Sequence, residues 1–223
     1  MPTSFLHWLW TTDAGLLVRI AAGAAIFLIL ALIDLRRRGP RATRWREYLF
    51  LLAVTALALL YGILNDLLTS SISWEYFYYG KDLAEILGPT TPPDSLPLHL
   101  QAALVGLKAT WSAGLLLGVV LLLANNPSQR FPQLLYRRLF RTLPLIILVT
   151  LLFSALTGLL GYLNMIPFMP ANMTDLLQST AIRPQPFLAV FGIHLGAYLG
   201  LVLSTILTIH KIRLTRRRLT KKV

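Results

Sequence analysis

Five long apolar segments alternate with polar segments along this chain. They cover residues 15–35, 48–68, 101–124, 143–163 and 187–209. A helix of about 20 apolar residues crosses the hydrocarbon core of a bilayer, and each segment reaches that length. The pattern therefore predicts an all-α polytopic membrane protein, a single domain in which five transmembrane helices form a bundle. Residues 69–100 and 164–186 are the two longer polar segments and predict outer loops.

Basic residues concentrate in three short segments that follow the first, third and fifth apolar segments. Residues 36–47, 125–142 and 210–223 hold 17 of the 21 lysines and arginines. An excess of Lys and Arg in short loops marks the cytoplasmic side of membrane proteins. We therefore expect these three segments and the C-terminus in the cytoplasm, and the N-terminus outside.

Composition agrees with this topology and excludes several classes of function. The chain is 56% hydrophobic and 13% charged, whereas soluble domains are about 25% charged. Topology and attraction to anionic lipid explain the net charge of +12, so we expect the lipid bilayer as a partner and no nucleic acid. The absence of cysteine excludes disulfides and thiolate chemistry. No catalytic motif is visible, and we expect neither a cofactor nor a metal.

The first outer loop contains a dense aromatic cluster around one carboxylate. Five rings surround Glu75 within six positions: Trp74, Tyr76, Phe77, Tyr78 and Tyr79. Trp and Tyr are enriched at membrane interfaces, so the favoured interpretation is an interfacial belt on an ordered outer loop. Glu75 is either solvated or paired with a cation beneath it.

Four predicted helices bring an ionisable group to the outer third of the membrane. These groups are Arg19, Asp66, Lys108 and His194. Lys108 and His194 share a depth of about 10 Å, and charges at such depths usually face the bundle and find partners. We predict a pair between Asp66 and Lys108, with Glu75 leaning toward Lys108; the alternative is that Lys108 snorkels to the headgroups. A hydrogen-bonded core histidine is the favoured interpretation of His194, over a metal ligand or a proton relay.

Two helices carry glycines at helical spacing, namely Gly114 and Gly118 in the third, and Gly192, Gly196 and Gly200 in the fifth. Such stripes let another helix approach closely, which predicts tight packing in the bundle or self-association. His194 lies about 200° round the helix from Gly192 and is expected to face away from the stripe.

Residues 61–83, YGILNDLLTSSISWEYFYYGKDL, resemble a family of uncharacterised bacterial integral membrane proteins. The matching positions are Tyr61, Gly62, Asn65, Asp66, Glu75, Tyr76, Phe77 and Gly80, and residues 105–127 are similar to the same family's next helix. The family often has Pro before the Glu, where this chain has Trp74. The resemblance implies a bacterial inner-membrane location and supplies no activity.

These patterns favour a non-catalytic membrane component that binds a partner or ligand at its outer face; the partner could be another membrane protein or a second copy of this chain. One alternative is a small transporter or ion-conducting protein, in which Asp66, Lys108 and His194 line a path. Below Lys108 and His194 only Ser, Thr and Tyr side chains would continue that path. The other alternative is an enzyme acting on lipid or envelope substrates with Glu75 or Asp66 as base, but a second catalytic partner is not evident.

Overall fold

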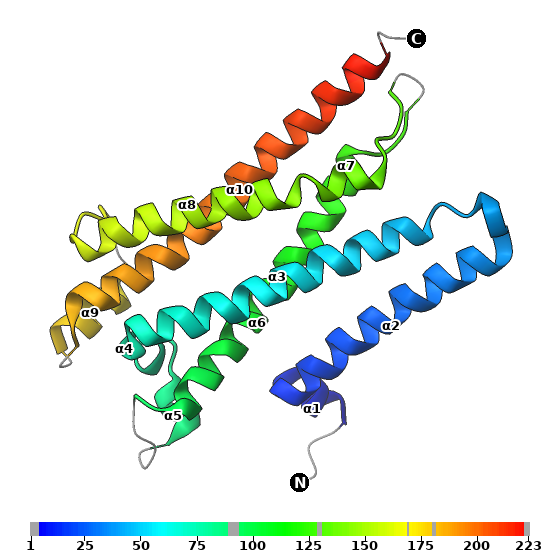
Figure 1. The fold of residues 1–223 in the computed structure, drawn as a ribbon. Helices are drawn as coiled ribbons and strands as arrows, with labels where there is room; N and C mark the ends of the chain where they lie inside the picture. Colours follow the sequence, from blue (N-terminus) through cyan, green and yellow to red (C-terminus); the bar gives the residue numbers. More distant parts are fainter. Residues whose placement is uncertain (1–4, 89–93, 129–130, 169, 180–181, 221–223) are drawn as a thin grey trace.

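The computed structural model describes residues 5–88, 94–128, 131–168, 170–179 and 182–220, and in these ranges it is helical with no strand. Five helices are long and apolar enough to cross a membrane. Their bounds are α2 (Asp13–Arg38), α3 (Trp45–Ile72), α6 (Leu96–Ala124), α8 (Leu143–Tyr162) and α10 (Pro184–Thr220) (Figure 1). The predicted all-α, multi-pass membrane architecture is therefore confirmed.

Short helices occupy the segments between the long ones. They are α1 (Phe5–Thr11), η1 (Gly39–Arg41), α4 (Trp74–Tyr78), α5 (Leu83–Leu87), α7 (Tyr136–Phe140) and α9 (Ala171–Ser179). Figure 1 shows α4, α5 and α9 at one end of the molecule, which we call the cap end, and α7 with the C-terminal end of α10 at the opposite, basic end.

Four of the five long helices extend beyond their apolar segments, and the ends of α10 and α3 have identifiable causes. The last helix, α10, runs to Thr220 although its apolar segment ends at residue 209, because the basic tail contains no Gly or Pro to stop it. At the cap end α3 continues to Ile72 and stops at Ser73, whose backbone is extended. The Ser73 hydroxyl then accepts a hydrogen bond from the Tyr76 N–H at 3.3 Å. This cap starts α4 and turns it back over the bundle.

Glycines make the closest helix contacts, and they do so in two separate pairs of helices. In the first pair, α3 and α6, Gly62 and Gly106 face each other so closely that a methyl group on either would overlap the other's backbone. Further along, a methyl group on Gly114 would lie 2.5 Å from the Cβ of Ala58, and Gly118 also meets α3. Only glycine allows this separation between the two backbones.

The second pair, α8 and α10, uses the longer glycine stripe. Gly192, Gly196 and Gly200 all lie against α8, and a methyl group on Gly200 would lie 2.8 Å from the Cα of Thr150. The close approach also lets Thr157 Oγ1 donate a hydrogen bond across the pair to the Gly192 carbonyl at 2.7 Å. Both predicted glycine stripes thus lie at helix contacts inside this chain.

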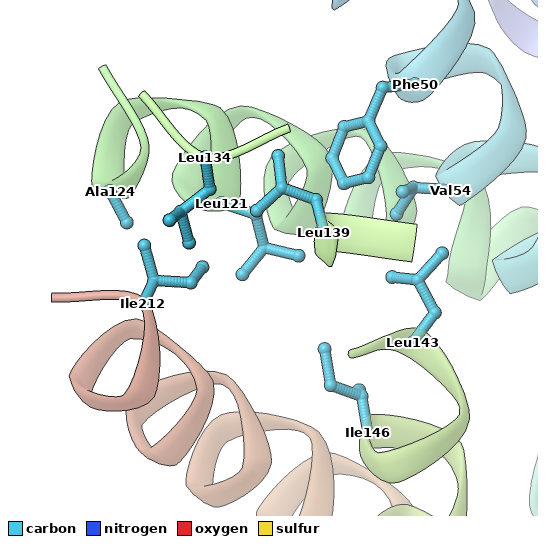
Figure 2. Close-up of a cluster of buried hydrophobic side chains, with 9 residues drawn as sticks. All are labelled: Phe50, Val54, Leu121, Ala124, Leu134, Leu139, Leu143, Ile146 and Ile212. Carbon is cyan, nitrogen blue, oxygen red and sulfur yellow. The ribbon is translucent and has the colours of Figure 1, made fainter. Parts of the chain in front are cut away.

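Two hydrophobic clusters close the two ends of the bundle. Figure 2 shows the one at the basic end, where side chains from four long helices and the segment before α8 meet: Phe50, Val54, Leu121, Ala124, Leu134, Leu139, Leu143, Ile146 and Ile212. At the cap end the cluster joins α4, α5, α6, α9 and α10 through Tyr76, Phe77, Leu83, Leu98, Ala102, Met173, Ile182, Phe187 and Val190. The space between the clusters holds the candidate site.

Candidate functional site

The most buried acidic group of the spanning helices pairs with a histidine. Asp66 on α3 is 4% exposed, and its Oδ1 lies 3.1 Å from Nε2 of His194 on α10. The other ring nitrogen, Nδ1, lies 2.8 Å from the carbonyl oxygen of Val190. His194 therefore faces α3 and away from the glycine stripe, as its position on the helix predicts, and it is hydrogen-bonded at both nitrogens.

The two nitrogens of this imidazole have different partners. A carbonyl oxygen only accepts, so Nδ1 of His194 is the donor toward Val190. Nε2 faces Asp66 Oδ1, and the two contacts together hold the ring between α10 and α3.

The two carboxylate oxygens of Asp66 differ in their hydrogen bonds. The Asn65 amide donates to the same Oδ1 at 3.0 Å. Among the residues that the structure describes, no group hydrogen-bonds to Oδ2 of Asp66, although the residue is almost completely buried. Among the described residues, the fully buried side-chain atoms without a partner are Arg19 Nε, Thr55 Oγ1, Ser95 Oγ and Thr208 Oγ1, so Asp66 Oδ2 keeps some accessible surface. Asp66 lines the cavity, and an accessible acceptor there can take a hydrogen bond from a donor outside the chain.

A cavity of about 120 Å³ opens beside Asp66, between the two glycine-packed helix pairs. Toward the cap end its polar lining includes Asn65, Asp66, Lys81 and His194, and Tyr61, Thr110, Thr150 and Tyr198 lie further along. Toward the basic end the walls are mostly apolar, with Leu57, Leu117, Leu143, Ile146 and Leu201 among them. The cavity therefore matches a molecule with a polar head and an apolar body.

Aromatic side chains of α4 cover the polar end of the site. The Tyr76 ring stacks on the His194 ring with centroids 5.0 Å apart, and the Phe77 ring meets it edge-on at 5.9 Å. Tyr76 is 2% exposed and Phe77 is fully buried. These two rings lie inside the protein, contrary to the expected interfacial belt, because the turn at Ser73 directs α4 inward.

The remaining rings of the cluster are only partly buried. Trp74, Tyr78 and Tyr79 pack against one another, with the Tyr78 and Tyr79 centroids 4.9 Å apart.

Burial and the nearby negative charge of Asp66 raise the pKa of Tyr76 well above its usual value. Its hydroxyl therefore stays protonated, and Tyr76 serves the site as a packed ring.

Glu75 forms a second charge pair at the cap end, in which the carboxylate is buried and the guanidinium is exposed. Arg183, just before α10, donates from Nε to Glu75 Oε1 at 2.6 Å and from Nη2 to Oε2 at 3.2 Å. Ser73 Oγ donates to Oε2 at 2.9 Å. Burial alone would raise the pKa of Glu75, but these hydrogen bonds outweigh it and hold the pKa below its usual value. Glu75 is therefore an ionised anchor that ties α4 to the start of α10.

Lys108 does not take part in this arrangement. Its ammonium pairs with Asp13 on α2 at 2.5 Å, and both side chains are partly exposed. The expected pair with Asp66 is not formed, because Gly106 is the α6 residue that faces Asp66: a methyl group on it would lie 3.0 Å from Asp66 Cγ. Lys108, two residues on, points about 200° away. Arg19, also on α2, lies over the Trp10 ring at 4.4 Å.

Two site residues were missed by sequence reasoning, Arg183 and Lys81. Lys81 is exposed, lines the cavity, and places its Nζ 5.5 Å from the centroid of the Tyr76 ring. The charge distribution in the sequence could have pointed to both. Only four basic residues lie outside the three basic segments, and they are Arg19, Lys81, Lys108 and Arg183.

Comparison of the chain with protein-family models, with curated proteins and with solved structures gave no match. The resemblance of residues 61–83 to a bacterial membrane-protein family therefore stays a prediction. The chemistry of the site rests on its geometry: a carboxylate oxygen of Asp66 without a partner in the described chain, an exposed lysine in the cavity lining, and mostly apolar walls elsewhere.

Proposed function

We propose that this protein is a non-catalytic component of the bacterial inner membrane that binds an amphipathic, lipid-like ligand in the cavity between its two helix pairs. The ligand's head carries a hydroxyl or ammonium group, which donates to Asp66 Oδ2. The observation that carries this proposal is the unpartnered Oδ2 of a 4% exposed carboxylate at the polar end of a mostly apolar cavity.

The chemistry of the lining defines the class of ligand. A donor in the ligand head would form a hydrogen bond to the charged oxygen of Asp66, a bond of a kind worth about 1.5–3 kcal/mol. Lys81 in the cavity lining favours an additional anionic group, such as a phosphate. The apolar walls accommodate a hydrocarbon chain. The excess of Lys and Arg at the basic end supports a cytoplasmic location for that end, so the ligand head would face the periplasm.

A second candidate, a small proton-coupled transporter, is favoured by one observation, the contact between the titratable side chains of Asp66 and His194 at 3.1 Å. A transporter needs a polar path to the opposite side of the membrane. The basic half of the cavity is mostly apolar, and the cluster around Phe50 and Leu139 closes it, so binding fits this geometry better than conduction.

The test is ligand retention by protein purified in mild detergent, measured by mass spectrometry of the extracted amphiphiles. Two variants act on different walls: Asp66→Asn removes the carboxylate, and Ala113→Leu fills the cavity without touching the Asp66 pair. Matched controls are Asp13→Asn, a carboxylate outside the cavity, and Ala56→Leu, on the exposed face of α3.

We expect the wild-type chain and both controls to retain an amphiphile, and each site variant to lose most of it. Equal retention in Ala113→Leu and Ala56→Leu would contradict the proposal even if Asp66→Asn folds poorly. Proton uptake by reconstituted vesicles, lost in His194→Gln, would favour the transporter instead.

A further inference from the structure

The basic end of α10 carries a second pocket, far from the cavity. It has a volume of about 240 Å³ and is lined by Phe131, Arg213, Arg216 and Arg217. Three of these four side chains are guanidinium groups, so the pocket concentrates positive charge.

Arg216 is built into the structure as a fixed cation. It is 7% exposed and donates four hydrogen bonds to backbone carbonyls: to Ala124 at 2.8 Å, Asn126 at 2.6 Å, Phe131 at 3.0 Å and Pro132 at 2.9 Å. A guanidinium has five N–H groups, so one remains for a ligand. Carbonyls carry only partial charges, and the full positive charge of Arg216 is not cancelled.

Arg213 and Arg217 bring two more unbalanced charges to the same face. They are four residues apart on α10, a spacing at which like charges repel. Within the described part of the chain, no carboxylate lies within 4.0 Å of a charged nitrogen of these three arginines. The acidic residues of the basic end are occupied elsewhere: Asp34 accepts from the Trp45 N–H, and Glu47 accepts from the Tyr136 hydroxyl.

The position of the pocket along α10 identifies the source of a balancing anion. Pro184 begins the helix at the cap end, and Arg213 follows it by 29 positions. At 1.5 Å per residue the distance is about 44 Å, which matches a bilayer of about 40–45 Å including both headgroup layers. The pocket therefore lies at the depth of the phosphates on the basic side.

We propose that this pocket binds the phosphate of an anionic phospholipid. The free N–H of Arg216 and the forks of Arg213 and Arg217 donate to the phosphate oxygens, since planar guanidinium groups suit phosphate well. The Phe131 ring, 5.9 Å from Arg216 Cζ, provides an apolar wall for the glycerol part of the lipid. This site is independent of the cavity and of its ligand.

The experiment measures the thermal unfolding of the full chain in mild detergent supplemented with phosphatidylglycerol, with phosphatidylcholine or with inorganic phosphate. The site variant is Arg213→Gln with Arg217→Gln, both exposed, so the fold is kept. The matched control is Arg137→Gln with Arg138→Gln, which removes the same charge from exposed positions at the same end, outside the pocket.

We expect phosphatidylglycerol alone to raise the midpoint of the wild-type chain and of the control. The site variant should need about tenfold more of this lipid for the same rise. An equal loss in the control would mean general attraction to anionic surfaces and would overturn the proposal. So would an undiminished response of the site variant. If inorganic phosphate reproduces the rise, the site takes a free anion and the lipid assignment is wrong.

Discussion

The two ends of the molecule bury charge in opposite ways. At the cap end, the carboxylates of Glu75 and Asp66 each contact a basic side chain from a distant part of the chain, Arg183 for Glu75 and His194 for Asp66. At the basic end, Arg216 is held by backbone carbonyls alone within the described part of the chain. The buried carboxylates of the cap end each have a partner of opposite or titratable charge within the chain, while the buried guanidinium of the basic end has none in the described residues.

The largest effect on stability should come from Arg216. In Arg216→Met the buried carbonyls of Ala124, Phe131 and their neighbours lose their donor, and we expect a loss of about 3 kcal/mol in unfolding free energy. Reversible unfolding in detergent measures it. The control Arg213→Met is exposed and should stay within about 0.5 kcal/mol of wild type. Equal effects of the two variants would show that Arg216 is not a buried anchor.

At the cap end, Arg183→Met leaves the Glu75 carboxylate buried without its cation. We expect a loss of about 1.5 kcal/mol, at the low end for a charged hydrogen bond, because Arg183 itself is 59% exposed and water replaces part of its effect. The double variant Arg183→Met with Glu75→Gln should lose less than the two single variants added together, since neither partner is then left charged. Strict additivity in this cycle would argue against the pair.

The stability of the cap end should depend on pH in the acid range, and that of the basic end should not. The pKa of Glu75 is lower in the folded than in the unfolded chain, so its contribution is present above the unfolded value of about 4.3 and is lost as pH falls below it. Arginine does not titrate there. The protection factors of the α4 amides against hydrogen exchange should therefore fall below about pH 4, while those at the start of α7 stay unchanged. Glu75→Gln, which has no proton to gain, should abolish the acid-induced change in α4.

The smallest effect is expected for Lys108. Its pair with Asp13 is partly exposed, and such pairs contribute about 0–1 kcal/mol. Lys108→Met should thus lower the unfolding free energy less than Arg183→Met does. A larger loss would mean that the attachment of α2 depends on this ion pair more than its exposure suggests.

The sequence was sufficient to predict the helices but only part of their contacts. Apolar length determines whether a segment crosses a bilayer, so all five spans were predictable. Lipid and protein core are both apolar, so hydropathy does not reveal which face of a helix meets which neighbour. Glycine spacing supplied that information for α10, and it correctly predicted that His194 faces away from the glycine stripe.

The candidate site was only partly predictable for the same reason. Counting residues along each helix placed Asp66, Lys108 and His194 at a similar depth. Which of these side chains form a pair depends on the direction in which each points around its helix axis. On α6 it is Gly106 that faces Asp66, so Lys108 points elsewhere. The pairing of Arg183 with Glu75 was not predictable, because the two residues are 108 positions apart and Arg183 lies in a loop without periodicity. Contacts between distant loops leave no regular pattern in a single sequence.

The two glycine-packed pairs have a mechanical consequence. Within each pair the backbones interlock, whereas α10 touches α3 and α6 much less than it touches α8. The cavity lies where these two closely packed pairs meet, at the less extensive of the contacts. A small displacement of one pair against the other would therefore change the width of the cavity without separating the glycine contacts, and it would open a sideways route for the hydrocarbon chain of the proposed ligand.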